Sequence, residues 1–543
     1  MKKRKNGNLK NKKQMLIIIA MISIMVFICV VMQAYIEGYF GDGKGKSTKA
    51  VNENSVQKKS DRTDAEAAKK PAKKKSTSKK KKSGKKKKKK ITHIAANPEG
   101  SRPIRVLITN SDFSDMFHNS IKITSSKSFY VKINNQTKTY PAGKKIEFKA
   151  ADKKLKGKKI VIGSYSGGRV KVLSIKRLEG HPGYRGTMTI KYKSKGLILT
   201  NTLPVEQYLY AVIPSEMSTG NNIEALKAQA VCARSYAYNQ MKADKYEEYG
   251  ADVDDSVACQ GYNNIPENQV YNNIPENEKS RKAVDSTFGD VMKKSGDVIT
   301  AYYFSTSWGY TADGQDVWNT PSQISYLSSR FQITQSSKRK TGVRGYDLSN
   351  ESTFRNFMNN ESCKTYDSNE EWYRWSVIIK EKSLRNRIDS ALSSCYLSNN
   401  ENVLTKTKNG KYKKSSVFKT GKITDIKISK REKSGMASQI IITGTLNTYK
   451  VNNQYNIRKV LAPVYETIKR RYGDSMSGYF MLPSAAFYID KTSGAFNITG
   501  GGFGHGTGMS QSGAGNMAKQ GNDYRQILHH YFSGVKIVTL KDY

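Results

Sequence analysis

The feature that most constrains this chain is an apolar run near its N-terminus, Met15 to Ile36, which contains no charged side chain. As an α-helix these residues would be about 33 Å long, close to the ~30 Å hydrocarbon thickness of a bilayer. The run is longer than the apolar part of a typical signal peptide, and no small-residue cleavage site stands at its end. We therefore expect an uncleaved transmembrane helix rather than a removable signal peptide.

The charges that precede this run predict its orientation. Residues 1–14 carry seven Lys and Arg side chains, and basic residues are retained on the cytoplasmic side of a membrane. We expect a basic cytoplasmic tail, a single pass through the cell membrane, and an extracytoplasmic chain on the cell-wall side after Ile36.

Residues 37–98 have the composition of a disordered linker. They lack apolar periodicity, and the segment from Lys69 to Lys90 contains 15 lysines, whose like charges extend the chain. A polylysine run alone favours nucleic acid, but outside the cell we expect anionic wall polymers or lipid head groups as partners and no nucleic acid. A solvated spacer that binds nothing is the alternative, and charge does not separate the two.

Composition excludes several classes of protein. The formal net charge is +48, the mean hydropathy is −0.66 and 25% of residues are charged, which excludes a polytopic membrane protein. With 37% hydrophobic residues, the chain is not wholly disordered. Five cysteines are too few for a disulfide scaffold, although Cys363 and Cys395 could pair if their Cα atoms lie within about 7 Å.

Residues 99–543 are expected to form an α+β domain of mostly antiparallel strands with interspersed helices. Residues 103–202 cluster β-branched residues between Gly, Asn and Asp, a pattern typical of strands. A helix with strong helix formers is expected from Ile223 to Met241, capped by Asn221. We expect further helices at Glu370–Ser394 and Ile457–Arg471, and further strands at Val298–Phe304, Ile423–Ile428 and Ile440–Thr445.

The segment Leu203 to Ala237 contains a candidate catalytic carboxyl group, Glu216. It follows the apolar residues Ala211 to Ile213 and Pro214, so burial could raise its pKa to a range suited to an acid catalyst. A nearby helix start would instead favour the carboxylate, so the sequence does not determine its protonation state.

Two further segments concentrate polar and aromatic side chains. Between Ile299 and Trp318 the aromatic residues could stack on sugars, although we expect at least two of them to lie in the core; they are Tyr302, Trp308, Tyr310 and Trp318. Between Gly500 and Gly521, His505 is flanked by glycines that permit a close approach to a ligand. It could bind a ligand, carry protons or act as a structural donor.

The motifs VIPSEM, EALKAQAVCARSYA and GGFGHGTGMSQSGAGNMAKQG occur in this order along the chain. Together they resemble the stage II sporulation protein D (SpoIID) family, which also includes the amidase enhancer LytB. The resemblance covers roughly residues 103 to 538. It implies an α+β domain that acts on peptidoglycan glycan strands as a lytic transglycosylase, cleaving between N-acetylmuramic acid (MurNAc) and N-acetylglucosamine (GlcNAc).

The resemblance also implies roles for individual residues. Glu216 would be the catalytic acid and base; a lytic enzyme needs one such carboxyl group, whereas glycoside hydrolases generally need two. Five other motif positions would bind glycan or support Glu216; these are Lys227, Gln229, Arg234, His505 and Gln511. Of the nearby carboxyl groups, Glu224 is expected to cap a helix and Glu206 to be structural.

Two departures from the family pattern bear on cofactors. Some members hold zinc in a Cys/His cluster after the helix, but here that region contains only Cys259, and no His occurs between His181 and His505. A structural zinc site needs four ligands, so we expect neither a metal nor another cofactor.

Two other functions remain open. The protein could bind the cell wall without cleaving it and stimulate an N-acetylmuramoyl-L-alanine amidase, the partner that the family name implies. Alternatively, the lysine-rich linker could make it an electrostatic adhesin for anionic wall polymers.

Overall fold

The computed structural model describes residues 101–540 except 178–179, 265–275, 361, 363 and 417. The predicted transmembrane helix, the lysine-rich linker and Cys363 lie outside these ranges, so they remain predictions. Within the described ranges, no helix has both the length and the apolar character needed to cross a membrane.

Residues 103–204 form strands β1 to β10, as the β-branched clusters predict. A seven-stranded sheet has the order β11-β1-β10-β9-β6-β3-β4 and a four-stranded sheet the order β5-β2-β7-β8. All pairs are antiparallel except β1 with β11. The elements are β1 (Pro103–Ile108), β2 (Ser120–Ser125), β3 (Phe129–Ile133), β4 (Gln136–Tyr140), β5 (Ile146–Lys149), η2 (Lys153–Leu155), β6 (Lys159–Ser164), β7 (Val170–Val172), β8 (Gly183–Tyr184), β9 (Thr187–Lys193), β10 (Gly196–Pro204) and β11 (Val253–Asp254).

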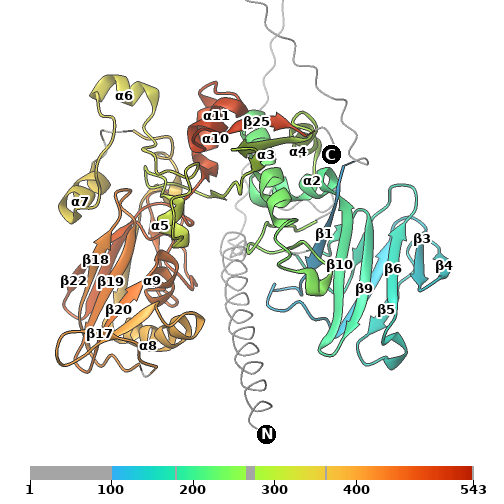
Figure 1. Ribbon diagram of the computed structural model, residues 1–543, viewed down its shortest axis with the longest axis horizontal. Coiled ribbons are helices and arrows are strands. Elements are labelled where there is room, and N and C mark those ends of the chain that lie inside the picture. Colours follow the sequence, from blue (N-terminus) through green and yellow to red (C-terminus); the bar gives the residue numbers. More distant parts are fainter. Residues whose placement is uncertain are drawn as a thin grey trace, which may run out of the picture. The chain divides into compact units, whose positions relative to one another are not determined.

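A helical group adjoins this sheet and includes segments from both ends of the domain (Figure 1). Helix α3 contacts α2, α4, α10 and α11, and β12, β13 and β25 form a small sheet. The elements are α2 (Val205–Glu216), α3 (Ile223–Gln240), η3 (Glu247–Tyr249), α4 (Glu278–Asp285), β12 (Asp290–Lys294), β13 (Asp297–Val298), α10 (Gln511–Lys519), α11 (Tyr524–Tyr531) and β25 (Lys536–Thr539). Because β10 continues directly into α2, the sheet positions the helix that ends at Glu216.

Two further sheets lie between these segments in sequence. They have the orders β21-β15-β23-β22 and β17-β16-β20-β19-β18, and α9 packs on β19 and β20 and also on α8 (Figure 1). The elements are α5 (Gly314–Trp318), α6 (Gln335–Thr341), α7 (Glu351–Asn359), η4 (Glu371–Tyr373), β15 (Trp375–Lys380), α8 (Glu381–Ser398), β16 (Val403–Lys406), β17 (Tyr412–Lys413), β18 (Ile423–Arg431), β19 (Ala437–Gly444), β20 (Thr448–Asn452), α9 (Gln454–Val460), β21 (Lys469–Arg470), β22 (Phe487–Thr492) and β23 (Ala495–Gly500).

The structure confirms the α+β class and corrects several boundaries. The predicted helix Glu370–Ser394 is instead strand β15 followed by α8, because Trp375 to Ile379 contains β-branched and aromatic residues that favour a strand. The predicted helix Ile457–Arg471 ends at Val460, shortly before Pro463, which cannot continue it. Helix α3 is capped by Asn222 rather than by Asn221.

Candidate active site

Glu216 is the last residue of α2 and lies partly buried at the point where the chain turns toward α3. Burial raises the pKa of its carboxyl group to about 7. The C-terminal end of a helix also disfavours a negative charge. At neutral pH both the protonated and the charged form of Glu216 are therefore populated.

Two hydrogen-bond donors oppose the effect of burial. The backbone amide of Gly261 donates to Glu216 Oε1 at 2.5 Å, and the side chain of Tyr303 also hydrogen-bonds to the carboxyl group. Both bonds stabilise the carboxylate and lower the pKa of Glu216, but burial is the larger effect. Neither donor was identified from the sequence. Gly261 lies 45 residues from Glu216 along the chain, and neither Gly261 nor Tyr303 belongs to one of the three family motifs.

Tyr303 is itself held in a chain of hydrogen bonds. Gln260 Nε2 donates to the Tyr303 hydroxyl oxygen at 3.1 Å, and the Tyr208 hydroxyl donates to Gln260 Oε1 at 3.2 Å. The orientation of the Tyr303 hydroxyl toward Glu216 is therefore fixed by residues of the helical group.

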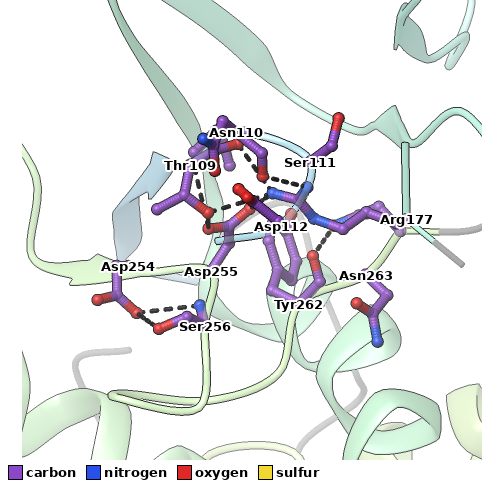
Figure 2. A network of polar contacts seen from close by, with 12 residues as sticks. Thr109, Asn110, Ser111, Asp112, Arg177, Asp254, Asp255, Ser256, Tyr262 and Asn263 are labelled. Atoms are coloured by element: carbon purple, nitrogen blue, oxygen red, sulfur yellow. Dashed lines mark hydrogen bonds and ion pairs between the residues drawn. The ribbon is translucent and has the colours of Figure 1, made fainter. Parts of the chain in front are cut away.

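A polar network supports the segment that delivers the Gly261 amide (Figure 2). Asp255 forms a fully buried ion pair with Arg177 at 2.5 Å and accepts hydrogen bonds from the amide and hydroxyl of Thr109. The backbone amide of Tyr262 then donates to the carbonyl of Asp255. These contacts hold residues 255–262 against β1 and so position Gly261.

Two glutamines that the sequence predicts as site residues lie beside Glu216. Gln511 Nε2, at the first position of α10, donates to the backbone carbonyl of Glu216 at 2.9 Å and to Gln229 Oε1 at 3.4 Å. Gln229 is fully buried, and its Nε2 has no hydrogen-bond partner in the described part of the chain. The two amides thus hold the end of α2 in place.

His505 adjoins this group through Tyr303. The Thr507 amide donates to His505 Nδ1 at 3.2 Å, and the ring also hydrogen-bonds to the backbone of Tyr303. Burial, with a smaller contribution from the charge of Arg458, lowers the pKa of His505 to about 4. The imidazole is therefore neutral at neutral pH, which excludes a proton shuttle that depends on its charged form there.

The glycines around His505 are required by close contacts. Gly504 and Gly506 have φ angles of 113° and 86°. A Cβ atom at Gly506 would lie 2.6 Å from the ring of Trp308. The loop can therefore present the imidazole only with glycine at these positions.

The four aromatic residues divide into two pairs, as the sequence analysis expects. Trp308 and Tyr310 are 1% and 5% exposed and belong to the core. Trp318 is 39% exposed, with its ring centroid 4.7 Å from that of Tyr302 and 5.2 Å from that of His505. An exposed aromatic surface thus adjoins His505.

Lys227 and Arg234, which the resemblance implies for glycan binding or for support of Glu216, each pair with a carboxyl group. Lys227 forms an ion pair with Glu224 at 2.7 Å. Arg234 is fully buried and forms two 2.7 Å hydrogen bonds with Glu206. Arg234 has no exposed surface with which to contact a glycan, so the structure gives it a core role, and Glu206 is structural as expected.

Within the described residues, no group of three or more His, Cys, Asp or Glu side chains is arranged to hold a metal ion. Cys232 and Cys395 are buried, and Cys363, the proposed partner of Cys395, lies outside those residues.

The geometry defines a class of protein, an α+β protein with a partly buried carboxyl group, Glu216, that is linked through Tyr303 and His505 to the exposed side chain of Trp318. Residues 193–293 match the family model described as stage II sporulation protein (SpoIID), and residues 396–508 match a domain of unknown function (DUF8618). The chain is thus similar, over part of its length, to proteins of the stage II sporulation protein D and amidase enhancer family.

Curated relatives are similar to the chain at low identity. It is 27% identical to the amidase enhancer of Bacillus subtilis over 339 residues, which are 61% of this chain and 40% of that protein. It is 26% identical to stage II sporulation protein D of the same organism over 371 residues, or 66% and 82% of the two chains. An uncharacterized protein of Brachyspira hyodysenteriae is 28% identical over 362 residues, or 66% and 73%.

Proposed function

We propose that this protein is a membrane-anchored peptidoglycan lytic transglycosylase, which cleaves the MurNAc–GlcNAc linkage and forms 1,6-anhydro-MurNAc ends. Similarity to this family supports a function related to the bacterial cell wall. The apolar run at residues 15–36 would anchor the protein, with the catalytic domain on the outer side of the cell membrane.

The observation that carries this proposal is the placement of Glu216 at the end of α2, where its partly buried carboxyl group accepts a hydrogen bond from the Gly261 amide and burial raises its pKa to about 7. A group that first donates and later accepts a proton works best when its pKa lies near the ambient pH. Among the described residues, no second carboxyl group contributes to the pKa of Glu216. This agrees with a reaction that needs one carboxyl group, whereas hydrolysis of glycosides generally uses two.

In the proposed reaction, protonated Glu216 donates its proton to the glycosidic oxygen as the bond from that oxygen to C1 of MurNAc breaks. The 6-hydroxyl of the same MurNAc then attacks C1, and the carboxylate of Glu216 accepts the hydroxyl proton. One C–O bond breaks and one forms, no water is consumed, and Glu216 returns to its protonated form. The Gly261 amide and Tyr303 stabilise the intermediate carboxylate.

The surroundings of Glu216 suit a sugar substrate. Trp318 is 39% exposed and packs beside Tyr302, so it offers an apolar ring surface on which the C–H face of a pyranose can pack. His505 is neutral and its ring bonds to the backbone of Thr507 and Tyr303, so it would position Tyr303 rather than act as a second acid.

Digestion of purified glycan strands tests this function. Wild-type protein is expected to release fragments with anhydro ends, and Glu216→Gln, which keeps the shape but cannot donate a proton, is expected to release none. Glu224→Gln, a change at a nearby carboxyl group, is the matched control and is expected to retain cleavage. Equal cleavage by wild type and Glu216→Gln would overturn the proposal.

A non-catalytic role is the second candidate, favoured by the similarity to a protein named amidase enhancer. In that case the protein would bind wall glycan and stimulate an amidase. Faster release of stem peptides by an added amidase, with glycan strands of unchanged length, would select this function over cleavage.

A further inference from the structure

Arg458 is a buried cation that has no carboxylate partner among the residues that the structure describes. It lies on α9 and is 7% exposed. Its Nε donates to the carbonyl of Leu482 at 2.9 Å and its Nη2 to the carbonyl of Pro483 at 3.0 Å. Both acceptors are neutral backbone groups. Two of the guanidinium nitrogens are therefore hydrogen-bonded, but within the described ranges no negative charge compensates the positive charge.

The other buried arginines of the described residues are paired with acids. Arg177 is paired with Asp255, Arg234 with Glu206 and Arg431 with Glu351. Burial lowers the pKa of Arg458 to about 10, and the opposing effect comes from Tyr455 rather than from an Asp or Glu side chain. A buried charge is normally retained only when an opposite charge compensates it, which indicates that a ligand supplies the missing anion.

Arg458 lies beside the proposed active site. The Pro483 carbonyl that accepts its hydrogen bond also accepts one from the amide of Gly504, at 3.0 Å. The charge of Arg458 acts on the neighbouring His505, whose ring adjoins Trp318. The nitrogen Nη1 of Arg458 makes no hydrogen bond within the described chain. It is also not fully buried, so it can donate a hydrogen bond to a ligand.

We propose that Arg458 is a substrate-binding residue that recognises a carboxylate on the muramyl unit of the glycan strand. This inference rests on the proposed function. The sugar rings are uncharged, so the anions available are the lactyl carboxylate of MurNAc, free when no stem peptide is attached, or a carboxylate of the stem peptide. Arginine binds either through charge-assisted hydrogen bonds.

Equilibrium binding, rather than cleavage, tests the proposal. The full-length Glu216→Gln protein is titrated with peptide-free MurNAc–GlcNAc oligosaccharides whose lactyl carboxyl groups are either free or converted to methylamides, and with peptide-bearing strands. The ligand whose carboxylate Arg458 recognises is expected to bind about ten- to a hundredfold more tightly than the neutral methylamide. Tight binding of only the peptide-free or only the peptide-bearing ligand identifies the source.

Two variants assign the preference to Arg458. Arg458→Met is expected to bind charged and neutral ligands equally, whereas Arg458→Lys, which keeps the charge, is expected to retain part of the preference. Lys459→Met is the matched control, because Lys459 is the next residue of α9, is equally buried and donates to Ser394 instead. It is expected to keep the full preference.

The proposal is overturned if the Glu216→Gln protein binds the methylamide as tightly as both charged ligands, a result that does not depend on any change at Arg458. It is equally overturned if Arg458→Met, folded by circular dichroism, keeps the preference. The binding result does not depend on whether the protein cleaves glycan. If the preference depends on Arg458 but no anhydro product forms, the proposed transglycosylase activity is rejected and the binding role of Arg458 stands.

Discussion

Glu216 illustrates how a single side chain can be prepared for two proton transfers. Its environment contains one effect that raises its pKa, burial, and two hydrogen bonds that lower it, from Gly261 and Tyr303. Burial outweighs the two hydrogen bonds and the resulting pKa lies near 7, so removing one of these effects is expected to move the activity along the pH axis.

The pH profile of cleavage tests this balance. The first proton transfer needs protonated Glu216, so kcat/KM is expected to fall as the pH rises through about 7. Tyr303→Phe removes a hydrogen bond that stabilises the carboxylate, so it is expected to raise the pKa of Glu216 and shift the falling limb upward by about one pH unit. The Tyr302 hydroxyl does not affect the pKa of Glu216, so Tyr302→Phe should leave the falling limb of the pH profile in place. A downward shift in Tyr303→Phe would contradict the assignment.

The buried pair of Arg234 and Glu206 predicts an effect on stability rather than on substrate binding. Arg234→Met leaves Glu206 charged and buried, which is expected to cost about 3–5 kcal/mol of the free energy of unfolding. Urea denaturation measures this loss. A variant of unchanged stability with weakened glycan binding would restore the role that the sequence motif suggested for Arg234.

At the scale of elements, Asp367 joins two segments that lie far apart in the sequence. It is fully buried and accepts hydrogen bonds from the amide and hydroxyl of Ser307 and from the hydroxyl of Ser510, the N-cap of α10. Burial nevertheless raises its pKa from 3.8 to about 6. The protonation state of Asp367 is therefore coupled to the position of α10 and of Gln511, the first residue of that helix.

This link predicts a pH-dependent stability. Because the folded protein binds the Asp367 proton more tightly than the unfolded chain does, the contribution of this group is full below pH about 4 and is lost as the pH rises through about 6. The loss is expected to be at most about 3 kcal/mol. Asp367→Asn should flatten this part of the curve of unfolding free energy against pH, and an unchanged slope would contradict the prediction.

Elements that depend on local sequence were predicted well, and those that depend on distant contacts were not. The helix from Ile223 and the strand from Ile423 agree with the structure because their patterns are strong over many residues. The helix predicted for Glu370 to Ser394 is right in its second part, which lies in α8, and wrong in its first part, which pairs with β23. That pairing joins residues more than a hundred positions apart, and a single sequence does not reveal it.

The same distinction holds for the site. Gln229 and Gln511 were identified with Glu216 through motifs, and the structure brings the three together. Gly261 was missed because its function is carried by a backbone amide, which every residue except proline has. Arg234 looked like a ligand-binding cation because the sequence does not show that Glu206 neutralises it.

At the scale of the whole molecule, the sequence outside the described residues determines where the site would act. Deletion of residues 1–36 is expected to release the protein from the membrane fraction, since that segment carries the predicted helix.

Deletion of residues 69–90 is expected to weaken retention on isolated cell walls in low salt and to have little effect in high salt, where charges are screened. Equal retention in low salt would indicate that the lysine run is only a spacer.

Mass spectrometry of glycan fragments released in oxygen-18 water tests the central claim most directly. A lytic reaction closes the ring with the 6-hydroxyl of the substrate, so we predict anhydro ends without oxygen-18 from wild-type protein and no cleavage by Glu216→Gln. Reducing ends that contain oxygen-18 would show that water is the nucleophile and would contradict the account.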